Sequence, residues 1–107
     1  MIPAVQKVAN EYKSMLQSLY GKDFVELIVF GSHARGDFHK ESDVDFAVVL
    51  RPSKIRVAEE IFKTAPISTQ LELKYGIMLS TLPVSEEKKN NSTQFVYQDI
   101  RKEGIVI

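Results

Sequence analysis

The chain has 107 residues, of which 44% are hydrophobic, so we expect a single compact domain spanning residues 1–107 with its own core. Lysine plus arginine and aspartate plus glutamate both number 14, and this balance argues against a general nucleic-acid-binding protein. The absence of cysteine excludes a disulfide framework and a thiolate metal site. The N-terminus lacks a signal-peptide pattern, and no stretch approaches the roughly 18 apolar residues of a membrane span, so we expect a cytoplasmic protein.

The N-terminal segment is predicted to be an amphipathic helix. Pro3 suits the first turn of a helix, and Gly21 can end it. Apolar residues recur between them at helical spacing: Val5, Val8, Tyr12, Met15, Leu16 and Leu19. The apolar run of residues 24–30 follows and is typical of a buried strand.

Two carboxylates stand at the start of the next apolar run, residues 44–50. Side chains alternate along a strand, so Asp43 and Asp45 are predicted to project from the same face. Two like charges about 6 Å apart at an effective dielectric of about 20 repel by roughly 3 kcal/mol, which favours protonation or a bound cation. Paired hard oxygen donors suit Mg²⁺ or Mn²⁺. The pattern therefore predicts a divalent metal site at Asp43 and Asp45.

A Gly31-Ser32 turn lies between the two predicted strands. Magnesium fills its remaining coordination positions with water and substrate phosphates, so a triphosphate is the natural second ligand. Gly31 allows close approach of the backbone to a phosphate, and Ser32 offers a hydroxyl and an amide where a short helix can begin. Alone, such a turn or such an acid pair has a purely structural explanation. Their combination between two apolar strands favours phosphate chemistry.

The loop between the turn and the acids holds further candidates. Arg35 suits a phosphate through its planar fork, or it forms a salt bridge to Asp37 or Glu41. His33 and His39 either contact a nucleotide or are solvated loop histidines, and their spacing does not indicate zinc.

The second half of the chain alternates helical and strand patterns. Ile55, Ala58, Ile61 and Phe62 predict the apolar stripe of a second helix, which Pro66 should end or break. Further elements follow in order: a short helix before Gly76, a strand at about 77–84, a helix start at 85–87, a loop at 88–93, a helix at about 92–103, and a short edge strand at 105–107. We therefore expect a small α/β (α+β) fold, with a mixed sheet of three to four strands and helices mainly on one face.

The signature can be compared with a known family. Gly31-Ser32, ten intervening residues and Asp43-Val44-Asp45 resemble the minimal nucleotidyltransferases of the DNA polymerase β-like nucleotidyltransferase superfamily. The triplet 34–36 and Ser42 also fit, and the specific resemblance covers about residues 24–50. It implies that Gly31 and Ser32 hold the nucleotide phosphates, while Arg35 stays a candidate from its own chemistry. It also implies that both aspartates bind divalent ions for the transfer of a nucleoside monophosphate, with ATP as the expected substrate.

One departure bears on activity. Many active members carry a third carboxylate on the next strand, whereas residues 77–82 contain no acid. Glu72 is the nearest candidate, although its surroundings resemble a helix end. Minimal members often work with a HEPN-domain toxin, whose tyrosine the antitoxin adenylylates. The resemblance thus implies a protein partner and leaves two functions open, an enzyme or a binding module that has lost turnover. Homo-oligomerisation also stays open.

Overall fold

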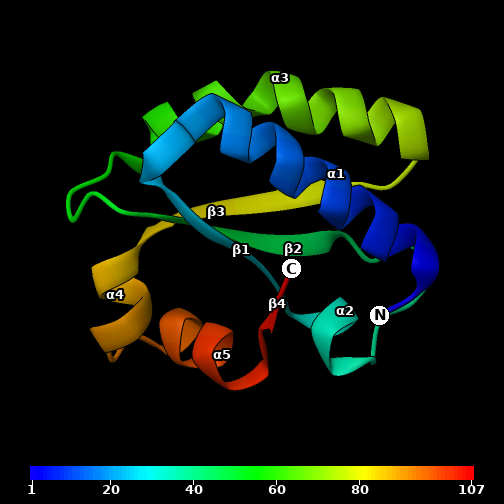
Figure 1. Ribbon diagram of the computed structural model, residues 1–107. Coiled ribbons are helices and arrows are strands. Elements are labelled where there is room, and N and C mark those ends of the chain that lie inside the picture. The colour runs from blue at the N-terminus through cyan, green and yellow to red at the C-terminus, as the bar shows by residue number, and fades with distance from the viewer.

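A computed structural model describes all residues from 1 to 107. Its centre is a four-stranded mixed sheet in the order β3-β2-β1-β4 (Figure 1). β1 runs antiparallel to β2 and β4, whereas β2 and β3 are parallel. The strands span Phe24–Phe30 (β1), Val44–Leu50 (β2), Leu79–Ser85 (β3) and Ile105–Val106 (β4). The predicted mixed sheet is confirmed, including the short edge strand at the end of the chain.

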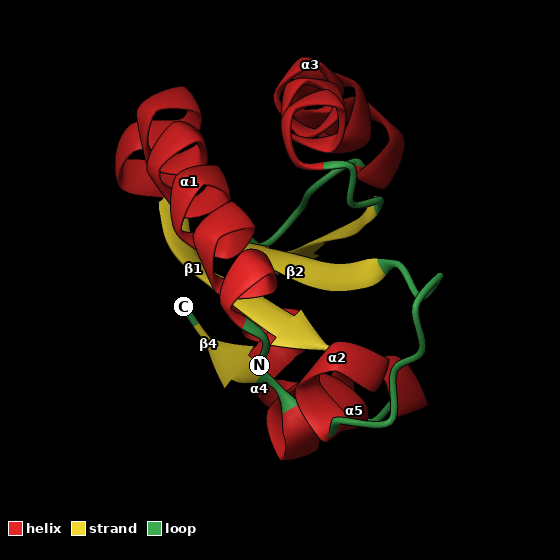
Figure 2. Ribbon diagram, turned by 90° about the vertical axis from the view of Figure 1, so that its right-hand side faces the viewer, coloured by secondary structure: helices red, strands yellow, loops and turns green.

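Helices lie on both faces of this sheet. The five α-helices span Pro3–Tyr20 (α1), Ser32–Arg35 (α2), Val57–Tyr75 (α3), Glu86–Asn91 (α4) and Phe95–Glu103 (α5). The two long helices, α1 and α3, cover one face, while the short helices lie toward the other (Figure 2). The expected placement mainly on one face therefore holds for the long helices. None of the helices combines the length and the hydropathy that a membrane span requires.

The alternation of side chains along β2 explains why both faces are covered. Val44, Phe46 and Val48 belong to the larger buried cluster, together with residues of α1 and α3. Ala47 and Val49 belong to a second buried cluster that includes Ile100 of α5. Because successive side chains point to opposite faces, Asp45 projects toward the face of Ala47 and Val49. Asp45, a residue of the site described below, is thus on the face opposite the long helices.

The course of α3 differs from the prediction. Pro66 neither ends nor breaks the helix, which continues from Val57 to Tyr75. Because proline has no N–H, the carbonyl four residues before Pro66 lacks its usual helical partner. Pro66 is exposed, so this turn of the helix lies beside solvent. The predicted stripe is also wrong, because Ile61 and Phe62 are 43% and 80% exposed. The buried positions of α3 are instead Glu60, Thr64 and Leu71.

The segment after β3 is more helical than expected. The predicted helix start is confirmed, because the Ser85 hydroxyl accepts a hydrogen bond from the Lys88 N–H at 3.1 Å. The predicted loop at 88–93 is partly wrong, since α4 continues to Asn91. The Arg101 guanidinium donates to the carbonyls of Lys89 and Ser92, both at 2.7 Å, and thereby ties α5 to the end of α4.

Candidate active site

The Gly31-Ser32 turn and the Asp43–Asp45 pair meet at one end of the sheet. The antiparallel register pairs Phe30, the last residue of β1, with Asp45 near the start of β2. Gly31 follows directly, with φ 74° and ψ −153°. A Cβ atom at Gly31 would overlap Oδ2 of Asp45 and lie 3.3 Å from its Cγ. A glycine is required here both by the backbone conformation and by this contact.

The turn leads directly into α2, the short helix expected at Ser32. The Gly31 carbonyl accepts hydrogen bonds from the N–H groups of Ala34 and Arg35, at 3.1 and 3.0 Å. The N–H groups of Ser32 and His33 have no hydrogen-bond acceptor within the protein, as is usual for the first residues of a helix. The turn therefore presents the Ser32 amide and hydroxyl as available hydrogen-bonding groups.

Asp43 and Asp45 differ in their surroundings. Asp43 is exposed, whereas Asp45 is partly buried. Burial raises the pKa of Asp45, and the negative charge of Asp43 raises it further. His33, Arg35 and the Ser80 hydroxyl partly oppose this rise. The ionised form of Asp45 therefore carries an electrostatic cost that a bound cation would relieve.

Arg35 lies next to this site but is held by two acids. Its Nε lies 3.1 Å from Oδ2 of Asp37, and its Nη1 lies 3.0 Å from Oε1 of Glu103. These contacts raise the pKa of the Arg35 guanidinium, chiefly through the hydrogen bond to Asp37. The sequence offered Asp37 and Glu41 as salt-bridge partners of Arg35, and the structure shows Asp37 in this role. The pairing with Glu103 joins residues 68 positions apart, and no local sequence pattern indicates it.

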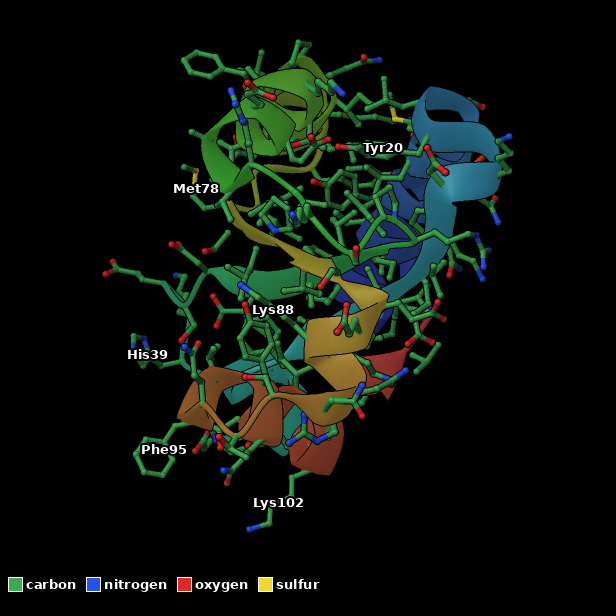
Figure 3. All side chains as sticks on the ribbon, turned by 90° about the vertical axis from the view of Figure 1, so that its left-hand side faces the viewer. Tyr20, His39, Met78, Lys88, Phe95 and Lys102 are labelled. Carbon is green, nitrogen blue, oxygen red and sulfur yellow. The ribbon has the colours of Figure 1, made fainter.

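The two loop histidines occupy different environments. His33 is buried, its Nε2 lies 3.1 Å from the Ser42 carbonyl oxygen, and its ring stacks on Phe38 with centroids 4.5 Å apart. It is therefore not a solvated loop residue, and its observed contacts hold the loop that leads to Asp43. His39 is exposed, and its side chain points away from the body of the protein (Figure 3).

β3 places no third acid beside the carboxylate pair. In the parallel register of β2 and β3, the residue paired with Asp45 is Ser80. Glu72 is instead bound elsewhere, because its Oε2 accepts a hydrogen bond from the Leu79 N–H at 3.0 Å. Glu72 belongs to α3, which covers the opposite face of the sheet. No group of three or more acidic, histidine or cysteine side chains is arranged to hold a metal ion.

A cavity of about 480 Å³ lies beside Asp43. Phe38, Ser42, Ile77 and Met78 are among the residues that line it, whereas neither residue of the Gly31-Ser32 turn does so. Met78 is 60% exposed, and its side chain lies on the same side of the molecule as His39 (Figure 3). Asp43 therefore borders the cavity, together with His33 of α2, whereas Asp45 contacts Gly31 of the turn.

The mixed sheet, with its Gly-Ser turn against an Asp-x-Asp pair, is the arrangement expected of a nucleotidyltransferase from the resemblance noted above. The family model described as the nucleotidyltransferase domain matches residues 9–107, and the chain belongs to this family. A curated relative from Methanocaldococcus jannaschii, named "Putative protein adenylyltransferase", is 31% identical over 95% of this chain and 96% of its own length. The general reaction of the family is transfer of a nucleotidyl group, so the chain is classed as a nucleotidyltransferase.

Two solved structures share the fold. One, named "putative minimal nucleotidyltransferase", has a TM-score of 0.61 and 22% identity over 100% of this chain and 97% of that chain. The other is a toxin–antitoxin structure with AMP-PNP, with a TM-score of 0.59 and 18% identity over 91% of this chain and 71% of that chain. At these identities the likeness establishes the architecture of the chain.

Proposed function

We propose that residues 1–107 form one domain that transfers AMP from ATP to a hydroxyl group of a partner protein. The observation that carries this proposal is the contact between Gly31 and the Asp45 carboxylate, which joins a phosphate-accessible turn to an acid pair. In this proposal Asp43 and Asp45 bind Mg²⁺ or Mn²⁺, and Gly31, Ser32 and Arg35 bind the phosphates. Use of ATP is supported by the named adenylyltransferase relative and by AMP-PNP in a structural neighbour.

The residues present fit a divalent cation. Burial and the neighbouring charge disfavour ionised Asp45, and two hard carboxylate oxygens are donors that Mg²⁺ prefers. When bound, such an ion supplies positive charge to the phosphate oxygens. Two protein carboxylates are also enough, because Mg²⁺ usually completes its coordination with water and substrate phosphates.

The turn and the cavity suggest how the reacting groups are placed. The Ser32 amide and hydroxyl hold the two phosphates that leave as pyrophosphate. Phosphoryl transfer needs the attacking and leaving oxygens roughly in line. Neither Gly31 nor Ser32 lines the cavity beside Asp43, and in this proposal the cavity receives the acceptor hydroxyl.

The transfer itself exchanges one ester bond for another. The acceptor oxygen forms a bond to the α-phosphorus while the bond to the bridging oxygen of pyrophosphate breaks. Since Ser80 stands where a third acid would adjoin Asp45, the proton of the acceptor passes to water or to a base of the partner protein.

A tyrosine of a HEPN-domain toxin is the acceptor that we propose. Three observations support a protein acceptor: the relative named protein adenylyltransferase, the toxin–antitoxin neighbour, and the partly apolar cavity beside Asp43. We place this reaction in the cytoplasm, in line with the cysteine-free sequence.

A second function is favoured by one specific observation. Ser80 occupies the position beside Asp45 where an additional carboxylate would assist deprotonation of the acceptor. A chain without that base can serve as an antitoxin or regulatory module that binds its partner and nucleotide without turnover.

The decisive experiment uses α-labelled ATP with the chain and its co-purified partner. Mg²⁺-dependent label on the partner, lost in a folded Asp45→Asn variant, supports the enzyme. Partner binding without label from any nucleotide supports the binding module instead. Calorimetric titration with AMP-PNP, with and without Mg²⁺, tests the nucleotide site independently of the acceptor.

A further inference from the structure

The last residue of α5 contacts the Gly31-Ser32 turn. Oε1 of Glu103 accepts a hydrogen bond from the Gly31 N–H at 3.2 Å and one from Arg35 Nη1 at 3.0 Å. Gly31 and Glu103 are 72 positions apart in the chain. Figures 1 and 2 both show the end of α5 close to α2, immediately before the chain enters β4. One carboxylate oxygen therefore links the turn, the arginine and the end of α5.

The backbone on both sides of Glu103 is fixed. A Cβ atom at Gly104 would overlap the Ile100 carbonyl oxygen and Cγ2 of Ile28, so α5 ends in close contact with β1. The next residue, Ile105, already pairs with Val29 in the sheet. The Glu103 side chain is only 22% exposed. This carboxylate is thus placed by a helix end on one side and by a strand on the other.

We propose that Glu103 is a positioning residue of the nucleotide site, which it serves by holding the Gly31 N–H and the Arg35 guanidinium. The proposal rests on the nucleotide site proposed above. With its N–H bound by Glu103, Gly31 stays against the Asp45 carboxylate, and the Ser32 amide remains available to a phosphate. A hydrogen bond from a charged donor to a charged acceptor is roughly twice as strong as a neutral one, which suits this fixing role.

An opposite role for Glu103 would have the opposite effect on nucleotide binding. If Glu103 were an internal anion that competes with the phosphates for Arg35, its removal would strengthen nucleotide binding. If it positions the turn, its removal weakens nucleotide binding. The sign of the effect therefore distinguishes the two roles.

The test compares the full-length wild type with Glu103→Ala, Glu103→Asp and Glu103→Gln. Calorimetry measures the Kd for Mg²⁺ and AMP-PNP, and NMR measures the hydrogen-exchange rate of the Gly31 amide without nucleotide. Asp99→Ala is the matched control, because Asp99 lies on α5, is exposed, and makes no side-chain hydrogen bond or ion pair.

Glu103→Ala should weaken binding by at least about tenfold and accelerate Gly31 exchange, since it removes a charge-assisted contact. The side chain of Glu103→Asp is one methylene shorter, so this variant should also bind more weakly and exchange the Gly31 amide faster. It replaces the alanine variant in the test if that variant does not fold. Glu103→Gln retains an acceptor oxygen but loses the charge, so its affinity should lie between those of the wild type and the alanine variant. Asp99→Ala should match the wild type in both measurements.

Unchanged or tighter AMP-PNP binding by Glu103→Ala would overturn the proposal, as would a glutamine variant as weak as the alanine variant. Such results leave the proposed function intact as long as the wild type binds the analogue. Absence of wild-type binding contradicts the proposed function itself, and Gly31 exchange still decides whether Glu103 holds the turn.

Discussion

Gly31 and Asp45 lie in direct contact, so that even a methyl group at Gly31 would overlap the Asp45 carboxylate. The register of β1 with β2 brings the two residues together, because it sets Phe30, the residue before Gly31, opposite Asp45. Gly31 also has a positive φ of 74°, a conformation that side chains disfavour. Backbone geometry and site geometry therefore impose the same residue for two separate reasons.

These two reasons can be separated by substitution. Gly31→Ala should lower the free energy of unfolding by about 1–3 kcal/mol and abolish Mg²⁺-dependent AMP-PNP binding, because the methyl group displaces the Asp45 carboxylate. Gly21→Ala is the control, since Gly21 has a similar backbone (φ 56°, ψ −129°) but no atom within 4 Å of its would-be Cβ. It should lose stability and keep binding. Equal nucleotide affinities of the two variants would contradict the steric role of Gly31.

Asp45→Asn should make the nucleotide-free protein more stable while it removes nucleotide binding. The neutral amide avoids the cost of burying a charge beside Asp43, which is the cause of the raised pKa of Asp45. We expect a higher Tm of the variant in thermal unfolding at neutral pH without divalent ions, and the gain should be small because Asp45 is only partly buried and water screens the repulsion. A lower Tm of the variant would show that ionised Asp45 stabilises the fold.

Stabilisation by Mg²⁺ should depend on pH. The raised pKa of Asp45 means that its contribution to stability is full below its unfolded-state pKa and is lost as pH rises through its folded-state pKa. Mg²⁺ binds the ionised form, so the Tm gain from Mg²⁺ should be largest near neutral pH and fade as pH falls through that raised pKa. Thermal unfolding from roughly pH 4 to 8 measures this. Asp45→Asn should show no gain from Mg²⁺ at any pH in this range.

Ser80→Asp should create the additional carboxylate that β3 lacks. Because Ser80 pairs with Asp45 in the parallel register, the new acid would lie beside the existing pair. We expect roughly tenfold tighter Mn²⁺ binding and lower stability without metal, from added like-charge repulsion. Mn²⁺ titration followed by electron paramagnetic resonance measures the first effect.

Glu72→Gln is the comparison for this prediction. The amide oxygen of glutamine can still accept the hydrogen bond from the Leu79 N–H, and Glu72 belongs to α3, the helix that covers the opposite face of the sheet (Figure 2). Its Mn²⁺ affinity should therefore equal that of the wild type. A large loss of Mn²⁺ binding in this variant would make Glu72 the missing acid after all.

Pro66→Ala should stabilise α3 without an effect on the site. Alanine restores the N–H that Pro66 lacks inside a continuous helix, and we expect about 1 kcal/mol or more in chemical denaturation. AMP-PNP affinity should stay constant, because α3 lies on the face opposite Asp45. Pro52→Ala, at an exposed loop position, is the control and should not gain stability. A destabilised Pro66→Ala variant would indicate that the proline ring itself makes needed contacts.

The local sequence was sufficient to predict those parts of the site that are formed by residues close together in the chain. The two-residue spacing of Asp43 and Asp45, and the position of the Gly31-Ser32 turn after an apolar run, are short-range patterns with direct geometric meaning. The boundaries of α1 were likewise predictable, because Pro3 and Gly21 act within a single turn of helix.

The failures on α3 have a different origin. Whether Pro66 ends a helix depends on whether the surroundings compensate for the missing hydrogen bond, and here Pro66 is exposed, so that water can do so. The buried side of α3 is likewise chosen by its neighbours. Tyr20 of α1 donates a hydrogen bond to Glu60 at 2.9 Å, which makes a glutamate an inward-facing residue while Phe62 is exposed.

The sequence by itself determined the strand–turn–strand segment, the acid pair and the family resemblance, since each depends on residues close together in the chain. Only the tertiary structure decided that Gly31 touches Asp45, that Glu72 is bound to Leu79, and that Glu103 reaches the turn. The physical reason is that each of these contacts joins two different elements of the fold. Strand register and helix packing create such contacts, and no local spacing encodes them.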